Sequence, residues 1–159
     1  MARVLIVYYS RSGNTQKMAE AVREGVEETG GVDVEVKKVE ETTPEDLLEP
    51  EGIIMGSPVY YGTLAAELKQ LIDDSVQFHG KLAGKVGGAF ATSGVAGGGT
   101  ETTVLDILKT MLVHGMIVKG SHQGAHYGPI AVKAPDDAAL ERCRKLGCDV
   151  AELTVKLSG

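Results

Sequence analysis

Apolar runs alternate along the chain with segments in which apolar residues recur every three or four positions. The first run, Val4–Tyr9, is followed by a helical pattern over 14–29 that ends at two glycines. Val32–Val39 alternates apolar with charged residues, which is typical of an edge strand with one covered face. Continuous apolar runs occupy 52–57 and 85–92. This alternation predicts a parallel sheet with crossover helices.

The second half of the chain continues the same pattern with shorter strands. Helical patterns are expected near 64–72, 100–114 and 136–157, and short apolar runs lie at 116–118 and 130–132. No internal repeat or linker interrupts the chain of 159 residues. We therefore expect a single domain, residues 1–159, of the α/β class, with about five parallel strands and helices on both faces.

Three loops are expected at the edge of this sheet where ligands bind. Doubly wound sheets hold ligands outside the carboxyl ends of their strands, where the strand order reverses. The segments 10–15, 57–62 and 92–99 each follow a predicted strand at that edge. We call these three segments the rim loops, and any small ligand is expected to contact them together.

The first rim loop, Ser-Arg-Ser-Gly-Asn-Thr at 10–15, suits a terminal phosphate monoester. Its three hydroxyl side chains can donate hydrogen bonds to phosphate oxygens, and Gly13 lets the backbone approach closely. The first N–H groups of the following helix have no partner within the helix and attract anions. The alternative is an ordinary strand-to-helix turn in which Ser12 or Asn14 caps the helix. Neither a Walker loop nor a G-x-G-x-x-G loop is present.

The other two rim loops suit a planar heterocycle. Loop 57–62 holds Tyr60 and Tyr61, two of the five tyrosines in the chain, and an aromatic ring offers a stacking face. Loop 92–99 is mostly glycine and alanine, so its backbone can reach the edge of such a ring. Each loop alone is also compatible with a simple turn. Together, a phosphate end, a stacking surface and a backbone-lined edge predict FMN as the cofactor.

Composition excludes several other classes of protein. The net charge of −6, with no cluster of Lys or Arg, argues against a nucleic-acid partner. No apolar run is long enough for a membrane span, and no signal-peptide pattern is present, so a cytoplasmic protein is expected. Two cysteines are too few for a four-thiolate iron–sulfur cluster. Cys143 and Cys148 diverge by about 140° on one predicted helix, so no disulfide is expected.

Several segments resemble the flavodoxin-like FMN proteins, and most closely a short version of the WrbA-type (tryptophan-repressor-binding-protein) NAD(P)H:quinone oxidoreductases. They span nearly the whole chain: 10–15, 56–69, 84–87, 92–94, 97–103 and 114–118. The Gly-Gly-x-x-Glu-Thr-Thr run at 97–103 and the His-Gly-Met-Ile-Val run at 114–118 are the most distinctive. The resemblance implies a flavodoxin-like three-layer α/β/α sandwich around a five-stranded parallel sheet in the order 2-1-3-4-5.

The resemblance also implies which residues bind the cofactor. The phosphate would be held by Ser10, Arg11, Ser12, Gly13, Asn14 and Thr15. The isoalloxazine would be lined by Pro58, Val59, Tyr60, Tyr61 and Gly62. Its other edge would meet Thr92, Ser93, Gly94, Gly97 and Gly98. No metal ligands are expected.

The segment after Val118 departs from the family, because 120–128 is shorter than the corresponding excursion and only its end matches the family's Tyr-Gly pair. From that match, His126 and Tyr127 are the candidate catalytic residues, with His126 bonding a quinone oxygen and Tyr127 closing the pocket. The alternative is that His126 is an exposed loop histidine. His79 and His114 are expected to satisfy local backbone groups, where a charged His114 would suit the end of its helix.

By this resemblance, NAD(P)H passes hydride to the flavin, and the reduced flavin gives two electrons to a quinone. The alternative is a flavodoxin-type electron carrier. Carriers usually flank the flavin with two aromatics and with acids, whereas 57–62 and 92–99 contain no carboxylate and 92–99 no aromatic. A flavin-bound regulatory protein is a third possibility. A homo-oligomer, dimer or tetramer, is expected, together with a small-molecule quinone or a redox partner and no membrane partner.

Overall fold

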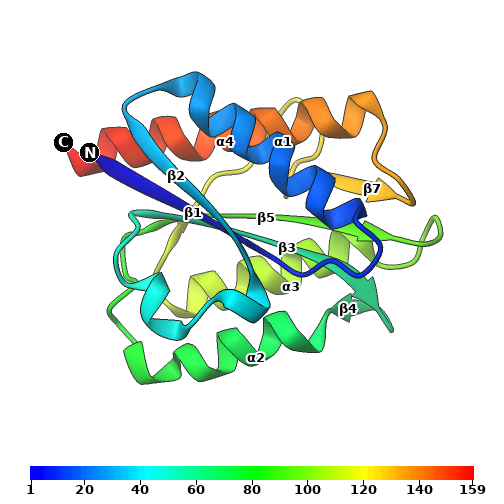
Figure 1. Cartoon of the computed structure of the whole chain (residues 1–159), viewed down its shortest axis with the longest axis horizontal. Coiled ribbons are helices and arrows are strands. Elements are labelled where there is room, and N and C mark those ends of the chain that lie inside the picture. The colour runs from blue at the N-terminus through cyan, green and yellow to red at the C-terminus, as the bar shows by residue number, and fades with distance from the viewer.

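The central strands of the sheet are apolar runs that are buried on both faces, as parallel sheets require. The computed structural model describes residues 1–159, and Figure 1 shows the sheet crossing the molecule between two layers of helices. Hydrogen bonds join the parallel strands in the order β2-β1-β3-β5-β6. Their bounds are β1 (Ala2–Tyr8), β2 (Val32–Lys38), β3 (Gly52–Tyr60), β5 (Val86–Ser93) and β6 (Ile117–Val118).

The predicted order 2-1-3-4-5 is confirmed, and the fifth position is shared by two short strands. β6 pairs with 86–87 at the start of β5, whereas β7 (Ile130–Val132) pairs with 91–93 at its end. The segment 119–129 between them is irregular, because its glycine- and histidine-containing sequence lacks the apolar pattern of a strand. One further strand, β4 (Thr63–Leu64), pairs antiparallel with the end of β3.

Helices cover both faces of the sheet, as the alternating pattern predicts. Figure 1 shows α1 and α4 along one face and α2 and α3 along the other. The helices are α1 (Asn14–Thr29), α2 (Ala66–Asp74), α3 (Thr100–Val113) and α4 (Asp137–Ser158), with 3₁₀ helices at Val39–Glu41, Pro44–Leu47 and Ser75–Phe78. None of them is long and apolar enough to cross a membrane. No three His, Cys, Asp or Glu side chains gather as a metal ion would need.

The core consists of two apolar clusters, one on each face of the sheet. Val4 and Ile6 of β1 face a cluster of 17 buried residues that includes side chains of α1 and α4. Leu5 and Val7 face a cluster of 16 buried residues that includes side chains of α2 and α3. Neighbouring residues of one strand therefore enter opposite layers, which explains why residues 4–8 of β1 are apolar at every position rather than alternating.

Glycines allow α1 and α4 to pack backbone to backbone. A Cβ on Gly25 would collide with the carbonyl oxygen of Arg144, and one on Gly147 would collide with that of Val22. Both cysteines of α4 are free, as predicted. Cys143 is buried in the core, and this burial raises the pKa of its thiol to about 12. Cys148 donates its S–H to the carbonyl of Gly25 at 3.1 Å, across the same helix pair.

Two segments differ from the sequence-based expectation. β3 continues to Tyr60 rather than ending at 57, so Pro58 and its neighbour Val59 are strand residues and not loop residues. The ladder between β1 and β3 ends at Gly56, so the missing N–H of Pro58 interrupts no bond to β1. Leu64, expected in the next helix, lies in β4 because the chain turns back on β3 before α2 begins.

Candidate functional site

The three rim loops contact one another at the carboxyl end of the sheet, on the right in Figure 1. The hydroxyl groups of Thr15 and Thr92 are 3.0 Å apart, which joins the first loop to the third. The guanidinium carbon of Arg11 lies 4.8 Å from the ring centre of Tyr60, which joins the first loop to the second. A Cβ on Gly99 would lie 3.3 Å from the carbonyl oxygen of Gly62, so the second and third loops also touch. The predicted constellation therefore forms one surface.

The amino end of α1 has no side-chain cap. Gly13 occupies the capping position with a φ of 95°, and its carbonyl accepts the first helical bond from the N–H of Lys17 at 3.1 Å. The N–H groups of 14–16 precede that bond, so they have no partner within the helix. The alternative, in which Ser12 or Asn14 caps the helix, is not observed, because neither side chain makes a capping bond. Ser10 instead accepts the N–H of Gly13 at 3.0 Å.

Unlike α1, helix α4 has a side-chain cap at its amino end. Asp136 precedes α4, and its carboxylate accepts a hydrogen bond from the N–H of Ala139 at 2.8 Å. α1 has no acid in its first turn, whereas α4 has Asp137 there. Both helices begin at the carboxyl end of the sheet, yet only α1 leaves its positive end open to an anion from outside.

Tyr60 and Tyr61 lie at the tip of a two-residue hairpin between β3 and β4. Tyr61 and Gly62 have φ values of 48° and 83°, as a type I′ turn requires. A tyrosine at positive φ is strained by roughly 1–3 kcal/mol, a conformation that is concentrated at functional sites. The turn exposes Tyr61 completely, with a relative accessibility of 108%. Its ring is therefore free to contact a ligand.

Tyr60 is held back from solvent by its neighbours. Tyr9 meets its ring edge to face, with ring centres 6.3 Å apart, and Arg11 covers it from the first loop. Burial raises the pKa of the Tyr60 hydroxyl, and the charge of Arg11 acts in the opposite direction. Tyr9 was not among the predicted site residues. The sequence could have indicated it, because Tyr9 directly precedes the first rim loop and follows another tyrosine at the end of the strand.

The third rim loop offers backbone rather than side chains. Thr92 and Ser93 are buried at the end of β5, and the Ser93 hydroxyl donates to the carbonyl of Val95 at 2.8 Å. Gly94 and Gly97 are exposed, and a Cβ on either would meet no atom within 4 Å. Gly98 is half-buried and donates its N–H to the same Val95 carbonyl at 3.2 Å. The exposed backbone of 94–97 is accessible, as a ring edge would need.

A family model described as a flavodoxin domain matches residues 5–119. The chain belongs to the flavodoxin domain family. FMN is the cofactor that this membership implies, as predicted, and proteins of this fold hold it between the first and third strands of the sheet. The residues present fit that group, because the uncapped α1 offers donors to a phosphate and no rim loop contains a carboxylate.

Relatives with two kinds of name share most of their length with this flavodoxin-family chain. A protein named flavodoxin from Aquifex aeolicus is 38% identical over 96% of this chain and 86% of its own length. A protein named NAD(P)H dehydrogenase (quinone) from Archaeoglobus fulgidus is 35% identical over 99% of this chain and 100% of its own. A similarly named protein from Sinorhizobium fredii is also 35% identical, over 99% of this chain and 100% of its own.

Solved structures agree with the sequence relatives. The flavodoxin, WrbA-like protein from Agrobacterium tumefaciens superposes with a TM-score of 0.80 at 27% identity, covering 98% of this chain and 99% of that one. A flavodoxin from the domain Archaea superposes with a TM-score of 0.79 at 31% identity, covering 96% of this chain and 99% of that one. The flavodoxin-like fold predicted from the sequence is confirmed.

His126 and Tyr127 lie outside the surface that the rim loops form. The hollows they line are completed by residues of α3 and α4, such as Glu101 and Arg142, and by no residue of 10–15, 57–62 or 92–99. Figure 1 shows the segment between β6 and β7, yellow to orange, beside α4 rather than at the right-hand end. His126 Nδ1 lies 2.7 Å from the carbonyl oxygen of Ser121, and both candidate side chains are exposed.

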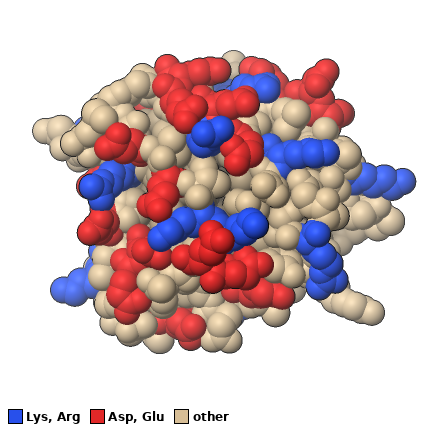
Figure 2. Space-filling view, viewed as in Figure 1, with Lys and Arg blue, Asp and Glu red and all other residues tan.

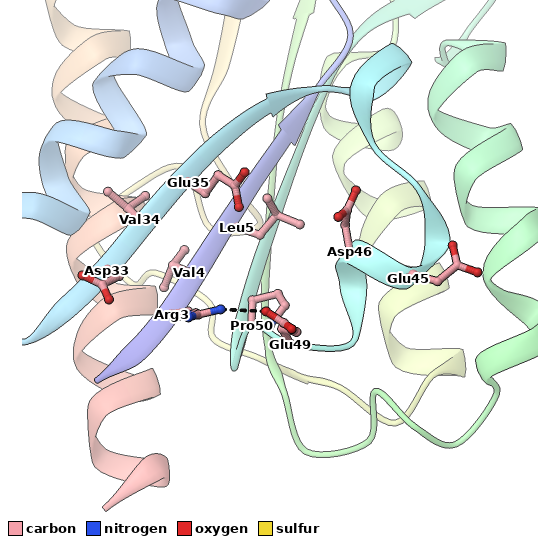
Figure 3. A pocket seen from close by; sticks show the side chains of 10 residues that line it. All are labelled: Arg3, Val4, Leu5, Asp33, Val34, Glu35, Glu45, Asp46, Glu49 and Pro50. Carbon is pink, nitrogen blue, oxygen red and sulfur yellow. Dashed lines mark hydrogen bonds and ion pairs between the residues drawn. The ribbon is translucent and has the colours of Figure 1, made fainter.

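A separate cavity of about 390 Å³ lies at the amino ends of β1 and β2. Figure 3 shows its lining, in which Arg3 pairs with Glu49 at 2.7 Å. Asp46, also in the lining, accepts from the N–H of Thr43 at 2.8 Å and pairs with Lys37 at 3.0 Å. Two acidic residues of this cavity, Glu49 and Asp46, are therefore already paired with neighbouring groups of the chain. The cavity lies at the opposite end of the strands from the rim loops.

The His114 ring lies at the end of α3 and bonds a neighbouring side chain rather than a backbone group. The Ser75 hydroxyl donates to the carbonyl of Ile72 at 2.6 Å, so His114 Nε2–H must donate to Ser75 Oγ, 2.8 Å away. The other ring nitrogen, Nδ1, is buried without a partner. Burial lowers the pKa of His114, and His79, whose ring centre is 6.1 Å away, lowers it further. His114 was expected to bond local backbone groups, whereas its Nε2 bonds the Ser75 side chain and burial disfavours its charged form.

Proposed function

We propose that this protein is an FMN-dependent oxidoreductase that takes two electrons from NAD(P)H and passes them to a quinone. The observation that carries the proposal is the open rim: exposed aromatic and glycine surface with no carboxylate in any rim loop. The full-length similarity to proteins named NAD(P)H dehydrogenase (quinone) supports it. When bound, FMN supplies the electron chemistry, and the protein supplies binding, orientation and electrostatics.

In this proposal the first rim loop holds the phosphate. The unpaired N–H groups at the start of α1 donate to its oxygens, and the hydroxyls of Ser10 and Ser12 are close enough in sequence to add donors. Thr15 has a different task, because its buried hydroxyl bonds that of Thr92 and fixes the loop against β5. Gly13 permits the left-handed turn that aims the helix end outward.

The other rim loops position the ring and leave space for its partners. Tyr61 provides an exposed stacking face, and Pro58 and Val59 extend the wall along the end of β3. The backbone of 94–98 provides donors and acceptors at the ring edge. The third loop contributes no aromatic side chain, which leaves one side accessible to a planar donor or acceptor such as nicotinamide or quinone.

In this proposal, the catalytic roles of His126 and Tyr127 require a second copy of the chain. Their side chains are exposed beside α3 and α4, so within one chain they do not complete the rim surface. A homo-oligomer, dimer or tetramer, would bring this segment to the rim of a second copy. Under this proposal, changing His126 to Ala weakens quinone turnover without altering FMN affinity.

A flavodoxin-type electron carrier is the second candidate function. The similarity to the Aquifex aeolicus protein named flavodoxin favours it. The two functions differ in how the bound cofactor accepts electrons. A carrier passes through a one-electron-reduced state with its own absorption bands, whereas the proposed oxidoreductase is reduced directly by two electrons.

The decisive experiment is anaerobic addition of NADH or NADPH to the FMN-loaded protein, followed by a water-soluble naphthoquinone. The proposal predicts rapid bleaching of the flavin absorption by one of the two donors, and its return when the quinone is added. An intact flavin spectrum with both donors, together with a stable one-electron state on chemical reduction, would favour the carrier instead.

A further inference from the structure

The three rim loops together contain a single charged residue. Segments 10–15, 57–62 and 92–99 contain Arg11 and no other Lys, Arg, Asp or Glu. In Figure 2, acidic side chains cover the left, the centre and the top of the visible face, whereas the right-hand tip shows basic and uncharged residues. A ligand at the rim therefore meets one fixed cation and no anion from these loops.

The structure holds this cation on an aromatic wall rather than in an ion pair. Arg11 lies 4.8 Å from the ring centre of Tyr60, within the range of a cation–π contact. Its pKa is raised first by a hydrogen bond to the Tyr9 side chain and then by Tyr60, with a small contribution from Glu67. By contrast, Arg144 pairs with two carboxylates, Glu24 at 2.7 Å and Glu141 at 3.2 Å. The positive charge of Arg11 is thus left available to a ligand.

The position of the guanidinium matters as much as its charge. Arg11 leaves the backbone in the loop after β1, yet its head group reaches the end of β3, where Tyr60 belongs to the segment proposed to line the flavin ring. The unpaired N–H groups proposed to bind the phosphate lie at the start of α1, on the other side of Gly13, whereas the hydroxyls of Ser10 and Ser12 flank Arg11 in the sequence. In this structure the head group therefore lies on the ring-binding wall and not at the helix end.

Reduction changes the charge of the group that the rim would hold. The oxidised isoalloxazine ring is neutral, and uptake of two electrons and one proton leaves it with one negative charge. A cation nearby stabilises the charged form and leaves the neutral form almost unaffected. Resting on the proposed function, we propose that Arg11 selectively stabilises the two-electron-reduced flavin and thereby favours two-electron chemistry at this rim.

A different role for Arg11 makes a different prediction. As an anchor for the phosphate, it would strengthen binding of oxidised and reduced FMN equally, because the phosphate charge does not change on reduction. It would also contribute nothing to riboflavin, which lacks the phosphate. The ratio of affinities for the two redox states therefore separates the two roles, independently of any turnover.

The test compares the wild type with Arg11→Met and Arg11→Lys. Fluorescence quenching gives the affinity for oxidised FMN and riboflavin, and a reductive titration with dithionite against a reference dye gives the reduced-to-oxidised affinity ratio through the binding cycle. Lys81→Met is the matched control, since it removes one exposed cation from the loop before β5, at the other end of the strands.

Arg11→Met is expected to weaken the binding of reduced FMN about tenfold more than the binding of oxidised FMN. This is the effect expected from the loss of one charge interaction at a partly exposed site. The same relative loss is expected for riboflavin, while Arg11→Lys and Lys81→Met keep the wild-type ratio within about threefold. An equal loss for both redox states of FMN, or an unchanged ratio in Arg11→Met, would overturn the proposal for Arg11 and leave the proposed function standing. A wild-type protein that binds no FMN would overturn both.

Discussion

The two ends of the parallel sheet differ in how far their polar groups are hydrogen-bonded within the chain. At the carboxyl end, the first N–H groups of α1 have no cap, and Arg11 rests on an aromatic ring instead of a carboxylate. At the amino end, Lys85 Nζ donates to the carbonyls of Leu48 and Pro50, and the backbone N–H of Arg3 donates to Glu51 at 2.7 Å. These amino-end groups are bonded within the chain, although His114 Nδ1 at the same end is buried without a partner. The carboxyl end leaves donors for a group from outside the chain.

This difference separates stability from binding. Polar groups that are bonded internally hold the fold together, and removing one leaves its partner unsatisfied. Groups left open contribute little to the free energy of unfolding, but they lower the cost of binding because they are already oriented. Substitutions at the amino end should therefore change stability alone, and substitutions at the carboxyl end should change FMN affinity far more than stability.

The largest effect is expected from Gly13→Asp, which places a carboxylate at the open end of α1. The carboxylate would occupy the positive end of the helix and repel the phosphate, so FMN affinity should fall by at least about a hundredfold. The left-handed backbone of Gly13, with a φ of 95°, strains any side chain, so the variant should also lose about 1–2 kcal/mol of unfolding free energy. Fluorescence quenching and urea denaturation measure the two quantities.

Gly13→Asn is the control for this comparison, because it has nearly the same shape without the charge. It should keep most of the FMN affinity that Gly13→Asp loses. Equal losses in the two variants would mean that side-chain bulk, rather than the open helix end, explains the effect.

The second prediction concerns Lys85, whose ammonium group bonds two backbone carbonyls at the amino end. Burial lowers the pKa of this group, and the charge of Glu51 opposes the shift. Lys85→Met should destabilise the fold by about 1.5–3 kcal/mol, since charged hydrogen bonds are lost. FMN affinity should not change, and Lys81→Met at an exposed position should affect neither quantity. Reduced FMN affinity in Lys85→Met would mean that the two ends are coupled.

A smaller effect is expected at the strained turn of the carboxyl end. Tyr61→Asn keeps a residue that accepts positive φ and removes the ring, so stability should rise by roughly 0.5–1 kcal/mol. FMN affinity should fall by up to about tenfold through loss of stacking. Thermal unfolding without ligand, followed by an FMN titration, measures both. A variant that loses stability would show that Tyr61 is packed rather than strained.

The smallest effect is the pH dependence of His114 at the amino end. Its pKa in the folded state lies below its ordinary value of 6.5, first because of burial and then because of His79. The unfolded state therefore binds more protons, so stability is retained above pH 6.5 and declines as the pH falls from there toward the folded pKa. His114→Gln should flatten this decline in urea denaturation between pH 7 and about 5. An equally steep decline in the variant would assign the effect to another group.

Much of the fold was predictable because buried parallel strands carry a continuous apolar signal. β1 and the start of β3 follow it directly, β2 follows the alternating pattern of an edge strand, and α1 ends at the predicted glycines. The division of the fifth strand was not resolved in advance, since runs of two and three residues carry no periodicity. The extension of β3 through Pro58 was missed because proline normally ends a strand, and only the early end of β1 makes it acceptable.

The candidate site was predictable at the level of loops but not of side chains. Topology alone places 10–15, 57–62 and 92–99 at one edge. The buried bond between Thr15 and Thr92, and the contact of Arg11 with Tyr60, join residues far apart in sequence, so no local pattern announces them. The role expected of His126 rests on a short match to the family's Tyr-Gly pair and stays a prediction, because the hollow that His126 lines contains no rim-loop residue.

The central claim is that the open end of α1 is a phosphate site, and the most direct test compares FMN with riboflavin. The two ligands share the same ring and differ in the phosphate. Titration of each into the cofactor-free protein, followed by fluorescence quenching, gives both dissociation constants. The account predicts that FMN binds at least about a hundredfold more tightly than riboflavin, a difference of about 2.7 kcal/mol. Equal affinities for the two ligands would contradict it.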